Sequence, residues 1–93
     1  MFALSFDMVV ADLKEHYGEP YNKAYYEIKV LLKDNGFTWV KGNTYLTAND
    51  DLTALFKVVM ELSKIDWFKR SVRDLRGFKV ESWSDFTELV KNS

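Results

Sequence analysis

Asp7 is the carboxylate whose place in the sequence is most informative about chemistry. The residues from Phe2 to Val10 alternate between bulky apolar and smaller side chains, a period of two that is typical of a β-strand. Asp7 interrupts the small-residue face of this strand, which it shares with Ala3, Ser5 and Val9. Any partner that buries this face must hydrogen-bond the carboxylate, neutralise it or coordinate a cation with it. Asp7 is therefore a candidate catalytic residue and metal ligand, with a structural ion pair to an arginine or a solvated strand end as the alternatives.

The segment from Lys69 to Lys79 is the one local concentration of positive charge. It contains five of the thirteen basic residues, including all three arginines, and only Asp74 opposes them there. A guanidinium group matches the geometry of phosphate oxygens better than an ammonium group does. Arg73 and Arg76 are therefore candidate nucleic-acid contacts. The alternative is a solvated face on which they pair with Asp74 or Asp7.

Aromatic residues on two short runs offer a second kind of chemistry. Trp39 and Tyr45 can stack on an unpaired base, and Tyr45 can donate a phenolic proton, although such side chains also commonly fill the core of a small domain. His16 is the only histidine, so one chain cannot form an acid–base pair of histidines. The acidic residues around it match no calcium-binding motif, and the four glycines form no phosphate-binding loop.

Four strands must position these residues. Alternation and runs of aromatic and β-branched residues predict them at Phe2–Val10, Phe37–Val40, Thr44–Thr47 and within Val72–Trp83. The turn Lys41-Gly42-Asn43 joins the middle two as a hairpin. In the last strand, apolar residues before and after Gly77 differ in parity, so the strand either begins near Arg76 or carries a β-bulge at Gly77, and we expect the bulge.

Two helices are predicted where apolar residues recur at intervals of three and four. The first starts at Pro20 and stops at Gly36, whereas the second is capped by Asn49 and ends near Ile65. After the last strand, Ser84 is expected to cap a final helical segment, Asp85–Lys91. The apolar side chains of that segment are expected to face inward: Phe86, Leu89 and Val90.

This order of elements predicts an α+β, ferredoxin-like βαββαβ fold, with two helices on one face of a four-stranded antiparallel sheet and a C-terminal helical extension. Residues 1–93 form a single domain. The bulky face of the first strand lies under the helices, which leaves Asp7 on the uncovered face. A second copy of the chain can cover that face in a two-fold homodimer, so that two copies of Asp7 approach each other and either share a proton or hold Mg²⁺.

Composition excludes several classes of function. A chain of 93 residues with 47% apolar residues supports one folded core, and the absence of cysteine removes disulfides, thiolate metal sites and a cysteine nucleophile. The net charge of -1 gives no overall attraction to nucleic acid or to anionic membranes. The apolar N-terminal stretch is too short to span a bilayer. We therefore expect a cytoplasmic protein without a membrane partner.

Several segments resemble one known family, the bacterial virulence-associated protein D (VapD) proteins. The resemblance covers nearly the whole chain, and its most specific part runs from Ser71 to Glu81 and continues through Trp83-Ser84-Asp85-Phe86-Thr87. Three shorter segments share it: Phe6-Asp7-Met8-Val9-Val10, Pro20-Tyr21-Asn22-Lys23-Ala24-Tyr25 and Gly42-Asn43-Thr44-Tyr45. The family is similar to the small CRISPR-associated adaptation nucleases, which implies a ferredoxin-like fold and a homodimer.

The resemblance also implies roles for individual residues. Asp7 matches the catalytic carboxylate that faces the dimer axis, and Tyr45, Arg73 and Arg76 match positions near that cleft. This chain has Lys41-Gly42-Asn43 where the family usually has Gln-Gly-Ser, so we expect Lys41 and Asn43 to contact nucleic acid in place of a serine hydroxyl. It also has Gly77 where the family usually has alanine.

The function that the resemblance implies is that of an endoribonuclease toxin in a bacterial toxin–antitoxin system. We expect it to cleave single-stranded or loop RNA as a homodimer, with Mg²⁺ as the candidate cofactor, Asp7 as its candidate ligand and an antitoxin protein as a further partner. Two alternatives use the same fold. One is a non-catalytic nucleic-acid-binding or interaction protein, and the other is a metal-dependent DNA nuclease.

Overall fold

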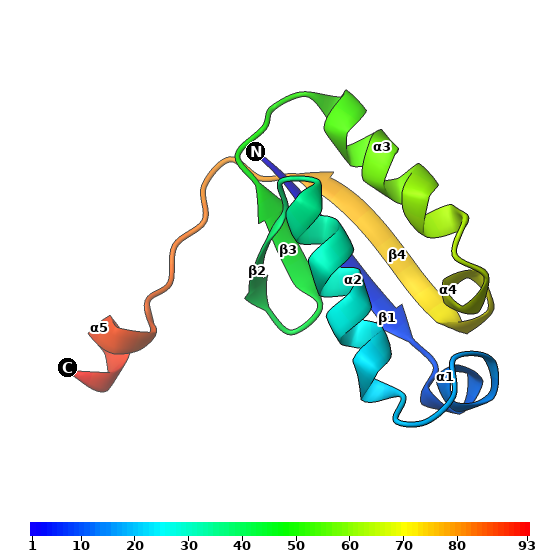
Figure 1. Cartoon of the computed structure of the whole chain (residues 1–93). Helices are drawn as coiled ribbons and strands as arrows, with labels where there is room; N and C mark the ends of the chain where they lie inside the picture. The colour runs from blue at the N-terminus through cyan, green and yellow to red at the C-terminus, as the bar shows by residue number, and fades with distance from the viewer.

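The computed structural model describes all residues from Met1 to Ser93. Its centre is one four-stranded sheet, in the order β2-β3-β1-β4, in which every neighbouring pair is antiparallel. The strands are β1 (Phe2–Met8), β2 (Thr38–Lys41), β3 (Thr44–Thr47) and β4 (Val72–Lys79). Two longer helices, α2 (Asn22–Asp34) and α3 (Leu52–Ser63), lie on the same face of the sheet (Figure 1). This confirms the predicted α+β, ferredoxin-like arrangement.

The core lies between this face and the two helices. The bulky side of β1 supplies Leu4, Phe6 and Met8, all buried, as the alternation predicted. Each fully buried side chain of this size contributes about 1.5–3 kcal/mol through removal of apolar surface from water. The helices meet β1 with residues spaced by three and four along one face: Ala24, Ile28 and Leu32 from α2, and Leu55, Val58 and Leu62 from α3.

Two short helices that were not predicted close one end of the sheet. β1 ends at Met8 rather than Val10, and α1 (Val10–His16) follows at once. The second, α4 (Asp66–Ser71), leads directly into β4. The two helices pack together: the Tyr17 and Trp67 rings meet edge to face at 4.9 Å between centroids. Each has fewer than two turns, so neither produces a visible helical period in the sequence.

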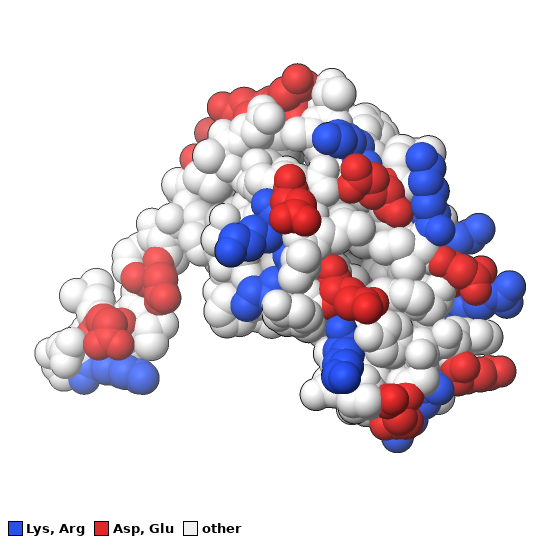
Figure 2. All heavy atoms as spheres, in the orientation of Figure 1, with Lys and Arg blue, Asp and Glu red and all other residues white.

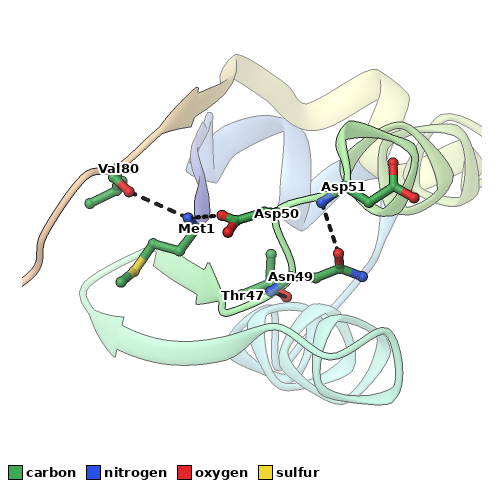
Figure 3. Close-up of polar contacts among 6 residues, drawn as sticks. All are labelled: Met1, Thr47, Asn49, Asp50, Asp51 and Val80. Carbon is green, nitrogen blue, oxygen red and sulfur yellow. Dashed lines mark hydrogen bonds and ion pairs between the residues drawn. The ribbon is translucent and has the colours of Figure 1, made fainter.

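The cap of α3 is Asp51, not Asn49 as predicted. The Asp51 carboxylate accepts a hydrogen bond from the Thr53 backbone N–H at 2.9 Å. Asn49 instead accepts a hydrogen bond from the Asp51 N–H at 2.8 Å, within the turn that precedes the helix. Beside this turn, the Met1 ammonium group donates to Asp50 and to the Val80 carbonyl, so the loop joins the start of β1 to the end of β4 (Figure 3).

The bulge in β4 lies at Arg73, and the prediction of a bulge at Gly77 is wrong. Pairing with β1 shifts between Asp7 and Met8, whose partners are Asp74 and Val72. From there to Lys79 the register is regular, so Leu75 and Phe78 differ in parity because they face opposite sides of the sheet. Gly77 serves packing instead, because a Cβ there would come within 2.7 Å of the Leu55 side chain.

The C-terminal helix α5 (Thr87–Lys91) stands away from the rest of the molecule (Figure 1). Phe86, Leu89 and Val90 are 62%, 68% and 70% exposed, so the prediction that they face inward is wrong for a single chain. The segment that links α5 to β4 extends away from the core. Phe86 lines an open cavity of about 550 Å³ between this segment and the β2–β3 hairpin instead of packing into the core. The start of α5 is held by Asp85, which accepts from the Thr87 N–H at 2.9 Å, and not by Ser84. None of the helices is long and apolar enough to span a bilayer.

Candidate active site

Asp7 lies on the uncovered face of the sheet, and its side chain is 57% exposed. Its Cα partner on β4 is Asp74. Directly opposed residues of antiparallel strands project from the same face with Cβ atoms roughly 5 Å apart. The fold therefore brings two carboxylates together within one chain. No pattern in the sequence indicates this pairing, because it depends on the register between β1 and β4.

Each of these carboxylates has an arginine partner. The Arg73 Nη1 lies 3.5 Å from Asp7 Oδ2, and the Arg76 Nε lies 3.0 Å from Asp74 Oδ2. All four side chains are substantially exposed. Exposed ion pairs of this kind contribute little to stability and are screened by salt. The arginines can therefore exchange a carboxylate for a phosphate at small energetic cost.

The β2–β3 hairpin turn lies at the same end of the sheet as Asp7. The backbone N–H of Phe6, the neighbour of Asp7, donates to the Asn43 carbonyl at 3.2 Å. Lys41 closes the hairpin opposite Thr44 and is exposed. On the uncovered face, the hydroxyls of Ser5 and Thr44 approach to 3.4 Å. The structure thus places the predicted residues Lys41 and Asn43 at the edge of the face that carries Asp7.

The basic segment from Lys69 to Lys79 does not form one continuous patch. Lys69 and Arg70 belong to α4, where Arg70 pairs with Asp66 at 3.0 Å. Lys79 lies at the far end of β4, opposite Phe2. Only Arg73 and Arg76 stand beside the two carboxylates.

Tyr45 is on the other side of the sheet from Asp7. It is the Cα partner of Leu4, is only 4% exposed, and stacks on Phe6 with 6.2 Å between ring centroids. Burial raises the pKa of Tyr45 above its ordinary value. A single chain therefore does not bring Tyr45 to Asp7, and its expected catalytic role stays a prediction.

The pKa of Tyr25, on α2, depends in part on the charge of Asp7, and sequence reasoning missed this residue. Burial raises the pKa of Tyr25, and the negative charge of Asp7 adds to the effect after that of Tyr21. Asp7 is the last and smallest of these three causes. Tyr25 lies in the first turns of α2, one of the two helices on the covered face of the sheet (Figure 1).

The two carboxylates of the uncovered face fit a magnesium ion in their chemistry. Mg²⁺ is commonly held by one or two carboxylates, with water and substrate phosphate oxygens completing its coordination. Asp7 and Asp74 supply those donors and remain accessible to water.

A separate group of side chains on α1 also has ligating atoms close together. The carboxylates of Asp12 and Glu15 and the imidazole of His16 lie within 4.8 Å of one another. They share one face of a short helix that follows β1, and they are not part of the pair formed by Asp7 and Asp74.

Curated proteins with related sequences match the chain from end to end. It is 55% identical over 93 residues to the Endoribonuclease VapD of Dichelobacter nodosus, with 100% of both chains covered. It is 51% identical over 84 residues to the Endoribonuclease VapD 1 of Riemerella anatipestifer, which covers 90% of this chain and 94% of the relative. It is 49% identical over 94 residues to the Endoribonuclease VapD of Helicobacter pylori, which covers 99% and 100%. No family model matches the sequence. Identity at this level over the full length confirms the resemblance found in the motifs, and the chain belongs to the VapD family.

Proposed function

We propose that this chain is an endoribonuclease whose reaction takes place on the uncovered face of the sheet, at Asp7. The relatives that match it over their full length are named as endoribonucleases. The observation that carries the proposal is the exposed Asp7 carboxylate, which lies opposite Asp74 and next to two arginines. In the homodimer proposed below, the Asp7 ends of the two sheets would border a cleft that suits a single strand or a loop of RNA.

The side chains of this face divide the work. Arg73 and Arg76 hold phosphate oxygens and stabilise the negative charge that grows on the phosphoryl group. Asp7 accepts a proton from the attacking hydroxyl, either a water or the 2′-hydroxyl of the substrate. As the new P–O bond forms, the P–O3′ bond breaks in the first case and the P–O5′ bond in the second, and the leaving oxygen takes a proton from solvent water. If Mg²⁺ is bound, Asp7 and Asp74 are the residues that hold it, and the ion supplies polarisation of a phosphoryl oxygen and acidification of a bound water.

The working form that we propose is a two-fold homodimer. Ala3 and Ser5 are small enough to let a second sheet approach the uncovered face closely, and Phe78 on the same face is 44% exposed. The exposed apolar residues of the arm, which we define as residues 81–93, need a surface to cover them. A second copy supplies that surface, because small oligomers are most often two-fold dimers.

The biological role that we propose is that of a toxin held in check by an antitoxin protein in the cytoplasm. This rests on the resemblance to the VapD family. Expression of the chain in a bacterial host should arrest growth, and expression of the Asp7→Asn variant at equal level should not. Equal growth arrest by both would contradict the role of RNA cleavage in toxicity.

The experiment that tests the activity uses matched RNA and DNA oligonucleotides of the same sequence, with Mg²⁺ or with a chelator. Cleavage of RNA only supports the proposal, whereas cleavage of DNA supports the metal-dependent DNA nuclease. Binding without cleavage supports the non-catalytic alternative. The product ends report the attacking group: water leaves a 5′-phosphate, whereas the substrate 2′-hydroxyl leaves a cyclic phosphate. Full activity in chelator with cyclic ends would remove Mg²⁺ from the mechanism.

A further inference from the structure

We propose that a cavity between α2 and β2, on the helix-covered side of the sheet, is a phosphate-binding site separate from the Asp7 face. The cavity has a volume of about 300 Å³ and is lined by Lys29, Lys33, Phe37, Thr38, Trp39 and Tyr45. This inference rests on the proposed function, because an endoribonuclease would meet phosphate as part of an RNA strand or of a free nucleotide.

Two lysines without a carboxylate partner give the cavity its charge. Lys29 and Lys33 are one helical turn apart on α2, so their side chains project toward the same side. Neither takes part in any of the ion pairs of the chain. No carboxylate lines the cavity. The lining therefore favours an anion and offers nothing to a metal ion. Figure 2 shows Lys and Arg side chains over the region between α2 and β2.

A tyrosine hydroxyl that makes no hydrogen bond within the chain points to the same kind of ligand. Tyr45 lines the cavity, is 4% exposed, and makes none of the side-chain hydrogen bonds of the chain. Burial alone accounts for its raised pKa, without a contribution from any neighbouring group. The hydroxyl oxygen itself is not fully buried, so it is accessible to a ligand in the cavity. A phosphate oxygen can accept from the Tyr45 hydroxyl and from both lysines at once.

An aromatic ring at the mouth of the cavity suits the rest of a nucleotide. Trp39 is 48% exposed, and the Lys29 Nζ lies 5.3 Å from its ring centroid. The indole N–H donates to the Gly42 carbonyl at 2.7 Å, which fixes the orientation of the ring. A base can stack on such a ring while its phosphate sits on the lysines. Because β2 is an edge strand, an RNA strand can pass from the Asp7 face around this edge by way of Lys41.

The test measures binding of a labelled single-stranded RNA over a range of salt concentrations. All variants are made in the Asp7→Asn protein, so that the RNA stays intact. The double variant Lys29→Ala/Lys33→Ala should bind several-fold more weakly, with the log–log salt slope reduced by about 0.7 for each lost phosphate contact. The control is Lys23→Ala/Lys64→Ala, which removes two lysines that are also exposed but lie outside the cavity, and it should leave the slope unchanged.

Tyr45→Phe isolates the hydroxyl, because it keeps the ring that packs on Phe6. Loss of one hydrogen bond to a charged phosphate should weaken binding by about tenfold without a fall in melting temperature. Unchanged RNA affinity in both the double-lysine and the Tyr45→Phe variants would overturn the assignment to RNA.

Competition by inorganic phosphate and by a 5′-mononucleotide identifies the source of the phosphate. Competition that disappears in Lys29→Ala/Lys33→Ala shows that the cavity takes a free nucleotide. No competition, together with the loss of RNA affinity, assigns it to the RNA backbone. If the parent binds no RNA, the proposed function fails, but direct titration with phosphate and mononucleotide still decides whether the cavity binds an anion. No heat or chemical-shift change in that titration would overturn the cavity site itself.

Discussion

Asp7 is exposed at the end of β1, and this exposure separates its two candidate roles. A buried ion pair would make its removal cost several kcal/mol, because an arginine would be left uncompensated in a medium of low polarity. The Asp7 and Arg73 side chains are 57% and 62% exposed, so either partner can be hydrated alone. If Asp7 served only as the ion-pair partner of Arg73, its removal would change the stability of the fold very little. The rate of RNA cleavage is therefore the quantity that tests its role.

Asp7→Asn should reduce RNA cleavage by at least about a hundredfold, because the amide keeps the shape but loses the charge and basicity. The melting temperature should stay close to that of the parent. Asp66→Asn is the matched control: it makes the same change in another exposed Asp–Arg pair, on α4, and should cleave normally. Near-normal cleavage by folded Asp7→Asn would remove this residue from the mechanism.

The two arginines of the uncovered face should contribute to RNA binding through phosphate contacts. Arg73→Ala and Arg76→Ala should each weaken binding and lower the log–log salt slope by about 0.7 if one phosphate contact on a single strand is lost. Arg70→Ala is the control, since Arg70 pairs with Asp66 on α4. A slope that stays the same in the two test variants would show that these arginines serve only their carboxylate partners.

Among the secondary-structure elements, α3 depends on a titratable cap. The pKa of Asp51 is lowered because its carboxylate accepts hydrogen bonds from Thr53. The charged form is thus preferred in the folded chain, so its stabilisation is complete above the ordinary pKa of 3.8 and is lost as the pH falls through the lower folded-state value.

Thermal melts of the parent and Asp51→Ala should therefore differ at neutral pH and converge as the pH falls below about 4. Asp51→Asn should keep much of the stability at neutral pH, because asparagine also caps helices, and its stability should not change with pH through this group. A constant difference between the parent and Asp51→Ala at all pH values would show that the cap does not depend on the charge.

The elements that sequence patterns could predict are those with enough residues to show a period. β1, α2 and α3 each present an apolar side that repeats, and the hairpin is marked by Lys41-Gly42-Asn43 between two β-rich runs. α1 and α4 are too short to repeat. The position of the bulge depends on how β4 pairs with β1, so it cannot be predicted from the residue pattern of one strand.

The same reasoning explains which parts of the site were predictable. Asp7 could be found because it breaks the pattern of its own strand. Asp74 could not, because its importance comes from the residue opposite it on another strand. The face of Tyr45 depends on its pairing with Leu4, so the motif that contains it says nothing about the side of the sheet on which it lies.

For the whole molecule, the arm is the feature that one chain leaves unpartnered. We expect the protein to sediment as a dimer at micromolar concentration. Phe86→Ser/Leu89→Ser should shift it toward monomer, because these exposed side chains have no other surface to bury them. A monomeric parent would contradict the dimer.

The control for this prediction is Phe56→Ser/Met60→Ser on α3, where the residues are 60% and 56% exposed. These substitutions remove a similar amount of exposed apolar surface from the outer side of a helix. They should leave the dimer intact. If the α3 variant dissociated into monomers and the arm variant did not, the dimer interface would lie on α3 and not on the arm.

The three tryptophans belong to three different segments, α4, β2 and the arm, and Trp39 and Trp83 line one common cavity between the last two. This makes the chain its own set of optical reporters. Trp67 packs against Tyr17 where α1 meets α4, Trp39 stands at the mouth of the cavity between α2 and β2, and Trp83 belongs to the arm. Variants that keep a single tryptophan would give emission signals for unfolding, for occupancy of the cavity and for docking of the arm. One protein sample, without any attached dye, could then show in what order these events occur.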